Sequence, residues 1–328
     1  MWPNPDLRPG VQTMDVLSDV LESTHVRSVV SGRMELSAPW GLQSAGDSHA
    51  MGFFVVTRGA FWLEMEGHAP LQVAGGDFVL VRKSVPHVMR DDPKTATLPV
   101  SEMLMHCPNR ARCQPGGVFQ FGGGGAVTTL VGGKFEIEDA SDNPLLSSLP
   151  PVIHIRGDGG STVQWLQSTL QFIAAEMASG MPGTETVVNR LADILLVQAV
   201  RAHLAENTER AGWLKALIDP QIGQALAVMH QRPNAAWTVE SLASEVAMSR
   251  SAFAARFSDL VEEPPLTYLT RWRMARATRL LRSGSVTIAE VASRVGYEAE
   301  AAFSKAFKRW TGLPPGAFRR NGLPTAAT

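Results

Sequence analysis

The sequence predicts an α+β chain: an all-β N-terminal domain, a pair of helices, and an all-α C-terminal domain with two helix-turn-helix motifs. Short alternating runs broken by Gly, Pro and Asp extend from residue 26 to about 155, which is typical of a β-sandwich or barrel. Two amphipathic stretches follow them. Residues 238–320 then repeat one pattern twice, and such an internal repeat indicates duplicated supersecondary units.

Length and composition indicate a globular protein with room for two domains in 328 residues. Hydrophobic residues make up 45% and charged residues 19%, which excludes a disordered chain. The longest apolar runs hold a handful of residues, such as residues 194–197, whereas a membrane span needs about 20. The first ten residues show no signal-peptide pattern. We therefore expect a cytoplasmic protein that does not contact membranes.

Charge is divided unevenly along the chain. From Asp219 to the end there are 14 Lys and Arg against 9 Asp and Glu, and the remainder holds 16 against 22. A basic C-terminal domain that follows an acidic N-terminal part is consistent with a nucleic-acid-binding surface on the C-terminal domain alone.

In the β-rich region, strands are expected at residues 52–56, 60–65, 77–81 and 100–106. Residues 75–87 (GGDFVLVRKSVPH) resemble the second sequence motif of the cupin barrel, in which a Gly-Asp turn precedes a strand and a His follows. Arg82 and Ser84 stand where cupins usually have Pro and Gly, and the histidine-rich first motif is not recognisable. The resemblance implies a cupin-like β-barrel, as a sensor domain, for residues 1–156.

Two helices are expected after the boundary at residues 157–161 (GDGGS), with a third, short one at residues 14–22. Residues 163–177 carry an apolar stripe, and so do residues 185–204; these stripes are Leu166, Leu170, Ile173 and Ala174, and Leu191, Ile194, Leu195 and Gln198. The pair either packs on its own barrel or forms a dimer interface. We assign residues 157–215 to this helical linker, in which residues 207–213 join it to a C-terminal domain at 216–328.

Each repeat unit has the parts of a helix-turn-helix. Thr238 can cap the first helix of one unit, and Thr287 with Glu290 forms a capping box in the other. Turns are expected at residues 247–249 and 296–297, followed by recognition helices at 249–260 and 298–310. The spacing of four predicts that one set of aromatic side chains is buried core: Phe253, Phe257, Phe303 and Phe307.

Between the units, residues 265–282 form one long predicted helix with five arginines. Such a rigid helix would hold the two recognition helices about 34 Å, or one DNA turn, apart.

This arrangement closely resembles the AraC/XylS family of bacterial transcription regulators. The family signature matches residues 288–320 (IAEVASRVGYEAEAAFSKAFKRWTGLPPGAFRR), and the barrel with its helices resembles sensor domains of one branch. The resemblance implies a sequence-specific regulator that binds promoter DNA as a homodimer. It further implies an activator, working with RNA polymerase, under a signal sensed by the N-terminal domain.

Mapped onto this sequence, the resemblance gives eleven DNA-binding residues. They are Arg250, Ser251, Ala254, Ala255 and Arg256 in the first unit, and Glu300, Ala301, Ser304, Lys305, Lys308 and Arg309 in the second. Alanines contact a thymine methyl but cannot read hydrogen-bonding edges, whereas Lys305 can read guanine and Glu300 cytosine. Lys308 and Arg309 are expected nearer the phosphates.

Three features of the N-terminal domain could sense the signal. The only two cysteines, Cys107 and Cys113, flank arginines that would favour reactive thiolates, so a redox switch is one hypothesis. A zinc or other soft-metal site is the second, with ligands from His106, Cys107, Cys113 and His87 or His49; unconnected side chains remain the alternative to both. A small-molecule effector bound near Phe54, Trp62 and Phe78 is the third.

A cupin-type metal-dependent enzyme with a helical appendage is the competing hypothesis. It requires a metal centre with three or four ligands and an open position. The sequence offers His87 and little else at the expected places, and no nucleophile with a base beside it. We therefore expect no catalytic residues.

Overall fold

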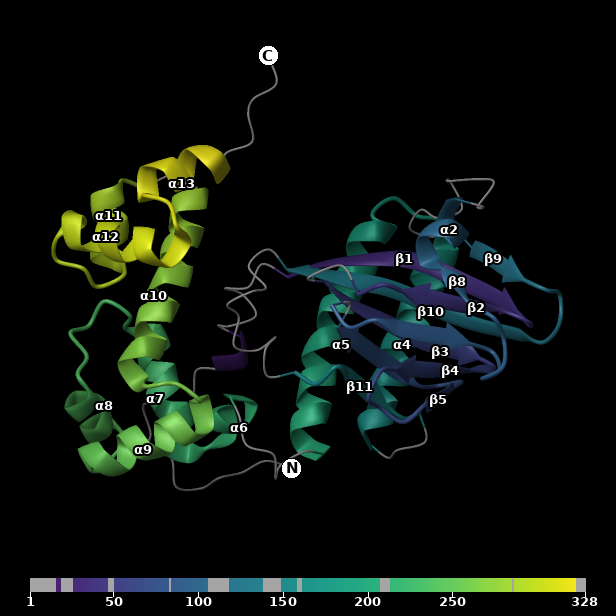
Figure 1. Cartoon of the computed structure of the whole chain (residues 1–328), viewed down its shortest axis with the longest axis horizontal. Coiled ribbons are helices and arrows are strands. Elements are labelled where there is room, and N and C mark those ends of the chain that lie inside the picture. The colour runs from purple at the N-terminus through teal and green to yellow at the C-terminus, as the bar shows by residue number, and fades with distance from the viewer. Residues whose placement is uncertain are drawn as a thin grey trace, which may run out of the picture. The chain divides into compact units, whose positions relative to one another are not determined.

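The computed structural model describes most of the chain, namely residues 16–18, 26–46, 50–82, 84–105, 118–137, 149–157, 161–206, 213–284 and 286–322. The chain divides into two units, one of them Thr24–Thr208 and the other Glu209–Thr328 together with Met1–Ser23. The first unit carries the strands and two long helices, and the second is helical (Figure 1), which confirms the predicted α+β class. Within the described residues, no helix is long and apolar enough to cross a membrane.

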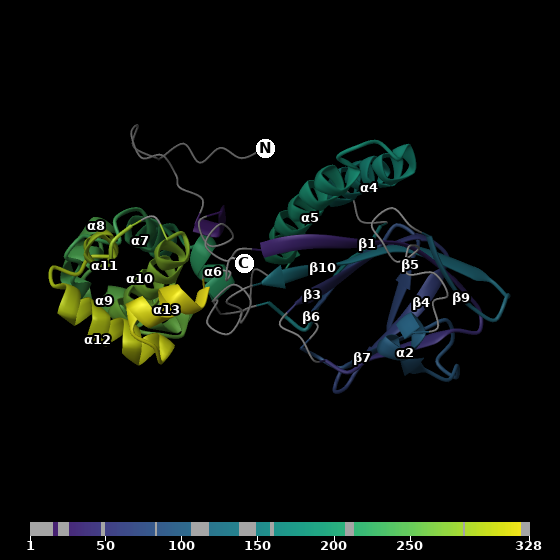
Figure 2. The same ribbon diagram turned by 90° about the horizontal axis from the view of Figure 1, so that it is seen from above.

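Two β-sheets form the body of Thr24–Thr208. The six-stranded sheet, ordered β11-β6-β3-β10-β1-β9, consists of β1 (Val26–Ser37), β3 (Met51–Arg58), β6 (Phe78–Arg82), β9 (Val118–Gly122), β10 (Val127–Ile137) and β11 (Val152–Ile155). The five-stranded sheet, ordered β5-β4-β7-β2-β8, consists of β2 (Gly41–Ser44), β4 (Ala60–Met65), β5 (Leu71–Ala74), β7 (His87–Arg90) and β8 (Leu98–Pro99). The cupin-like barrel is thus built as two facing sheets (Figure 2).

The hydrophobic core of this unit lies between the two sheets. Along β4, Phe61, Leu63 and Met65 are buried while their neighbours are less so, because alternate side chains point to opposite faces. Phe54 and Val56 of β3 enter the same core from the other sheet. This alternation explains why short mixed runs of sequence became strands.

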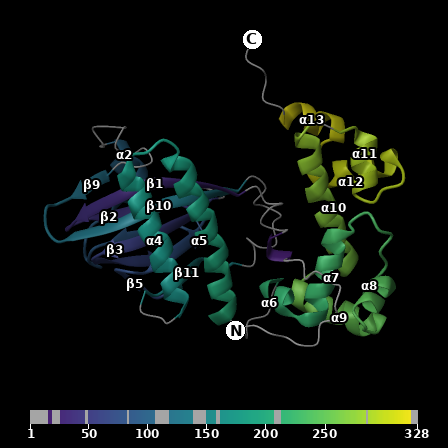
Figure 3. The same ribbon diagram turned by 180° about the vertical axis from the view of Figure 1, so that it is seen from behind.

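The outer face of the six-stranded sheet is covered by α4 (Ser161–Ser179) and α5 (Thr184–Glu206), as Figures 2 and 3 show. On β3, this coverage buries the side chains of both faces. Phe53 stacks on Phe78 with ring centroids 6.2 Å apart and meets Phe135 at 5.0 Å. Two apolar layers therefore flank one sheet.

Polar contacts fasten α5 to β1. The pairing register of β1 with β10 shifts between Val30 and Gly32. At that irregularity the Val30 amide donates to Asn189 Oδ1 over 3.2 Å, and the Ser28 hydroxyl donates to Asp193. The bulge of β1 is thereby tied to one face of α5.

Three sequence predictions for this unit have different outcomes in the structure. The expected strand at residues 100–106 is wrong, because Val100–Met105 forms the helix α2; apolar Val100 and Met103 are spaced for a helix, and Glu102 lies in its favourable first turn. The two long helices are confirmed, but Ile194 is 48% exposed and lies outside the buried stripe. Of the predicted short N-terminal helix, residues 16–18 are described as helical, and the rest lies outside the described residues.

The helical unit contains two similar motifs joined by one long helix (Figures 1 and 3). Its helices are α6 (Trp213–Ile218), α7 (Pro220–Gln231), α8 (Val239–Glu245), α9 (Arg250–Val261), α10 (Pro265–Arg282), α11 (Ile288–Arg294), α12 (Glu300–Thr311) and α13 (Pro315–Gly322). The pairs α8–α9 and α11–α12 are the two predicted helix-turn-helix motifs, and α10 is the predicted connecting helix.

Local signals explain the helix boundaries. Thr238 forms a capping box with Ser241, and Thr287 forms one with Glu290, so orphan amides of both first helices are satisfied. Phe253, Phe257, Phe303 and Phe307 are fully buried, which confirms the predicted cores.

Candidate nucleic-acid interface

The recognition helix of the first motif, α9, buries one face and exposes the other. Phe253 and Phe257 lie in the core with ring centroids 5.6 Å apart. The predicted contact residues of this helix are exposed except for the half-buried Ala254: Arg250, Ser251, Ala254, Ala255 and Arg256. At about 3.6 residues per turn, the first four lie together on one side of the helix, whereas Arg256 lies on another side.

The recognition helix of the second motif, α12, is oriented by the same kind of core. Phe303 and Phe307 are buried with centroids 5.5 Å apart. The other side carries the remaining predicted residues, of which Ser304 alone is half-buried: Glu300, Ala301, Ser304, Lys305, Lys308 and Arg309. Lys308 and Arg309 lie in the last turn, where cations interact favourably with the helix dipole.

The two faces differ in chemistry at matching positions. Ala254 and Ala255 in α9 correspond to Ser304 and Lys305 in α12, at an offset of 50. A methyl group offers only apolar contact to a base edge, whereas a hydroxyl and an ammonium group offer hydrogen bonds. At these two positions, the second helix can therefore make hydrogen bonds to base edges that the first cannot make.

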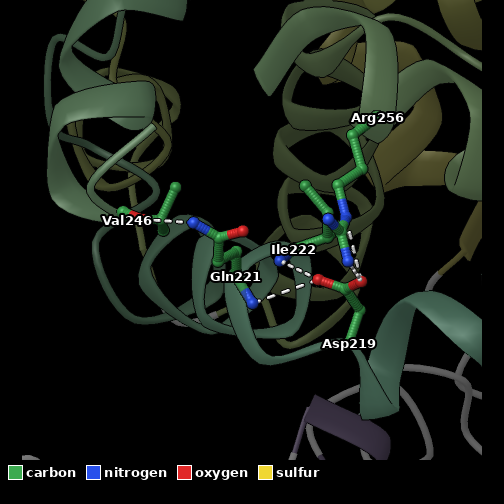
Figure 4. A network of polar contacts seen from close by, with 5 residues as sticks. All are labelled: Asp219, Gln221, Ile222, Val246 and Arg256. Carbon is green, nitrogen blue, oxygen red and sulfur yellow. Dashed lines mark hydrogen bonds and ion pairs between the residues drawn. The ribbon is translucent and has the colours of Figure 1, made fainter. Parts of the chain in front are cut away.

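A polar network holds α9 against the start of α7 (Figure 4). Arg256 Nη2 donates to Asp219 Oδ2 over 2.6 Å and Nε donates to the same oxygen over 3.1 Å. The other oxygen of Asp219 accepts from the amides of Gln221 and Ile222 at 3.1 and 2.9 Å, which caps α7. Gln221 Nε2 donates to the carbonyl of Val246, 3.1 Å away.

The electrostatics of Asp219 favour its charged form. Burial raises the pKa of this carboxyl, but the hydrogen bonds from the Ile222 amide, the Arg256 guanidinium and the Gln221 amide outweigh it. The pKa therefore lies below its usual value. One half-buried carboxylate thus joins the N-terminus of α7 to α9.

Sequence reasoning missed this network. Asp219 followed by Pro220 is a usual signal for a helix start, with the acid at the N-cap and proline at the first helical position, so the cap was recognisable. The pairing with Arg256 was not, because it joins residues 37 positions apart. The structure thus gives the predicted contact residue Arg256 an intramolecular partner.

The structure does not bring Phe54, Trp62 and Phe78 together as one pocket lining. Phe54 lies in the core between the sheets, while Phe78 packs with Phe53 on the helix-covered side. Trp62 is half-buried and alternates with the inward-facing Phe61 and Leu63 of β4. The three aromatic side chains occupy three different layers.

Of the candidate metal and redox residues, only His87 lies among the described residues. His87 is buried at the start of β7, with Nδ1 2.9 Å from the Val85 carbonyl. His49, His106, Cys107 and Cys113 lie outside the described residues. Among the residues that the structure describes, no three His, Cys, Asp or Glu side chains are grouped so as to hold a metal ion.

Comparison with known families assigns both parts of the chain. A family model described as cupin matches residues 15–205. A helix-turn-helix domain model matches residues 242–321, which include both recognition helices.

Relatives match over nearly the whole chain. A putative AraC-like transcription regulator of Streptomyces lividans is 37% identical and covers 94% of this chain and 99% of its own length. The transcriptional regulator AlkR of Acinetobacter baylyi is 31% identical, with 94% and 99% covered. Among solved structures, the DNA-binding domain of AdpA in complex with a target DNA is 32% identical, covering 31% of this chain and 92% of that one with a TM-score of 0.30. The enzyme hypothesis is not supported, because the full-length relatives are named as regulators.

Proposed function

Because the chain belongs to the AraC family of helix-turn-helix DNA-binding transcription regulators, with a cupin N-terminal domain, we propose that α9 and α12 are its two DNA-reading helices. The observation that carries this proposal is the pair of exposed helix faces opposite the buried phenylalanines. In this proposal, α12 makes more of the hydrogen bonds that select bases, and α9 makes positioning and apolar contacts with the DNA.

Each exposed residue of α12 has a role that its chemistry supports. Lys305 reads a guanine edge and Glu300 accepts from a cytosine amino group. Lys308 and Arg309, a turn further on, contact phosphates, which fix the register but carry no direct sequence information. In α9, Arg250 and Ser251 contact the backbone, and Ala254 and Ala255 lie against thymine methyl groups or the sugar.

Binding to a panel of operator duplexes tests this division. A bound sequence is first selected from a random pool with the full-length protein, and each base pair is then varied. Lys305→Ala should relax preference at one or two positions by about 1–3 kcal/mol each. Lys308→Ala, the matched control, should weaken binding to all duplexes alike and reduce the salt slope by about one. A uniform loss for Lys305→Ala would remove its base-reading role.

The homodimer is proposed to form through α4 and α5. Four of the six large apolar side chains that are exposed among the described residues of Thr24–Thr208 belong to this hairpin: Phe172, Met181, Val187 and Ile194. Phe172 is 67% exposed, and clustered apolar exposure of this kind marks an interaction surface.

Sedimentation equilibrium checks the dimer. Phe172→Glu together with Ile194→Glu should shift the full-length protein from dimer to monomer. Val127→Glu places the same charge on an apolar residue of β10 that is 40% exposed, and it should leave the dimer intact. A dimer that survives the paired substitution would place the interface elsewhere.

The regulator is proposed to act in the cytoplasm as an activator that works with RNA polymerase at a promoter. Its signal is a small molecule or an oxidant received by the N-terminal domain, with the Cys107 and Cys113 pair as the oxidant-sensitive or soft-metal element. The contacts of Asn189 and Asp193 with β1 offer a route from the sheet to α5. Mass spectrometry of native protein with oxidant and with chelator distinguishes the two cysteine roles, and inert, metal-free thiols would exclude both.

A further inference from the structure

Arg273 connects α10 to the turn between α7 and α8. It lies in the middle of α10, and its side chain reaches the turn between α7 and α8. Nε donates to the Pro233 carbonyl over 2.6 Å, and Nη2 donates to the Ala235 carbonyl over 2.8 Å. The connecting helix is therefore bound to the turn that leads into the first motif.

This guanidinium is half-buried. Burial lowers its pKa, and the nearby Tyr297 of the second motif partly opposes that effect. A charged group loses hydration on burial and persists there only with strong hydrogen bonds. The planar fork of arginine supplies two such bonds to one turn in a fixed geometry, which the compact ammonium group of lysine does not reproduce.

The turn of the second motif packs on the same place. Gly296 has φ +81°, and a Cβ added there would lie 2.9 Å from both Asn234 Cα and the Pro233 carbonyl oxygen, and 2.8 Å from Arg273 Nη2. Two of these three neighbours are backbone atoms, which cannot move as a flexible side chain can. Glycine at this position thus permits backbone-to-backbone contact between the turn of the second motif and the segment that leads into the first.

The contact lies where α10 passes from one core to the other. Trp272 stacks on His230 of α7, which precedes the first motif, with ring centroids 3.6 Å apart. Met274, two residues later, is buried in the core of the second motif. The contact of Arg273 and Gly296 with the α7–α8 turn is thus a second connection between the two halves of the unit, beside α10 itself.

We propose that Arg273 and Gly296 brace the second helix-turn-helix motif against the first and thereby determine which spacing between two DNA segments the chain accepts. This inference rests on the proposed reading of DNA by both α9 and α12. Arg273 acts here as a positioning residue, since its hydrogen bonds go to protein carbonyls.

Operators of altered spacing test the brace. The two contacted segments are located on the selected operator by footprinting, and one base pair is added or removed between them. Each such change moves one segment by about 3.4 Å and rotates it by about 35°. Wild-type protein should bind these operators about tenfold more weakly than the original.

Arg273→Lys and Gly296→Ala should each reduce that preference to about threefold or less, while binding to a duplex that keeps only the α12 segment stays unchanged. Arg279→Lys changes the same group further along α10. Ala247→Gly changes the equivalent turn of the first motif, where alanine already has φ +54° and is exposed. Both controls should keep the wild-type preference.

The possible failures are distinguishable. Full wild-type spacing preference in both brace variants would overturn the brace alone. Absence of any spacing preference in the wild-type protein would overturn the two-helix reading, and the brace with it. If Arg273→Lys fails to fold by circular dichroism, Gly296→Ala, which retains both donors of Arg273, carries the same test.

Discussion

Replacement of Asp219 by alanine removes two connections at once. The substitution takes away the N-cap of α7 and the carboxylate that pairs with Arg256. Asp219→Ser is the matched variant, because serine caps a helix about as well as aspartate but cannot pair with arginine. Arg256→Ala removes the ion pair and keeps the cap.

The expected losses follow from the contacts. An N-cap exchanged for alanine costs about 1 kcal/mol. The Arg256 side chain is 48% exposed, so solvent screening limits the ion pair to about 0.5 kcal/mol. Asp219→Ala should therefore reduce the free energy of unfolding of the helical unit by about 1.5 kcal/mol, and Asp219→Ser and Arg256→Ala by about 0.5 kcal/mol each.

Urea unfolding of the full-length protein measures these differences, and its pH dependence identifies their source. Since the folded-state pKa of Asp219 is lowered, its contribution is complete above the unfolded-state pKa of about 3.9 and is lost as pH falls through the folded-state pKa. The difference between wild type and Asp219→Ala should therefore shrink below about pH 4. Equal losses for the alanine and serine variants would refute the capping role.

DNA binding then separates the two roles open to Arg256. A guanidinium that stays on Asp219 contributes no phosphate contact, so Arg256→Ala should leave the dependence of affinity on salt unchanged. Loss of one phosphate contact would instead reduce the slope by about one. That reduction would show that Arg256 leaves Asp219 for the DNA, as the sequence-based assignment implies, and would refute the positioning role.

Two further predictions concern the cores. Phe303→Ala should cost about 3–5 kcal/mol of unfolding free energy in calorimetry of the helical unit, because the ring is fully buried. Burial raises the pKa of Asp77, but hydrogen bonds from the Ala74 and Gly157 amides and from His154 lower it overall. The stability of the sheet-rich unit should therefore fall below about pH 4 in wild type and lose that dependence in Asp77→Asn, as urea midpoints across pH 3–6 would show.

The sequence was most informative where local signals determine the structure. Thr287 and Glu290 mark a helix start within four residues, and phenylalanines spaced by four identify a buried face wherever the helix lies. Such patterns depend on backbone geometry alone. For the same reason, the two helix-turn-helix motifs and α10 were predicted nearly to their ends, and the predicted contact residues of each motif share a face except for Arg256.

Predictions failed or could not be made where contacts between residues distant in the sequence determine the structure. Phe54 and Phe78 belong to neighbouring strands of one sheet, but Phe78 pairs with Val55 and therefore faces the opposite layer from Phe54. That second layer exists because α4 and α5 cover the sheet. Ile194 fits an apolar stripe by spacing, but Leu195 and Leu196 are the side chains that meet the rest of the unit. The pairing of Arg256 with Asp219 likewise depends on how α7 meets α9, which no periodicity in either helix specifies.

The two copies of the repeat differ where their surroundings differ. Their turns share a left-handed residue at matching positions, Ala247 at φ +54° and Gly296 at φ +81°. A left-handed backbone alone does not require glycine here, since an exposed alanine adopts it in the first motif. Contact with Pro233 and Asn234 does require it, because a methyl group would overlap backbone. The glycine in the second motif thus follows from its position against Pro233 and Asn234, and the two turns differ because their surroundings differ.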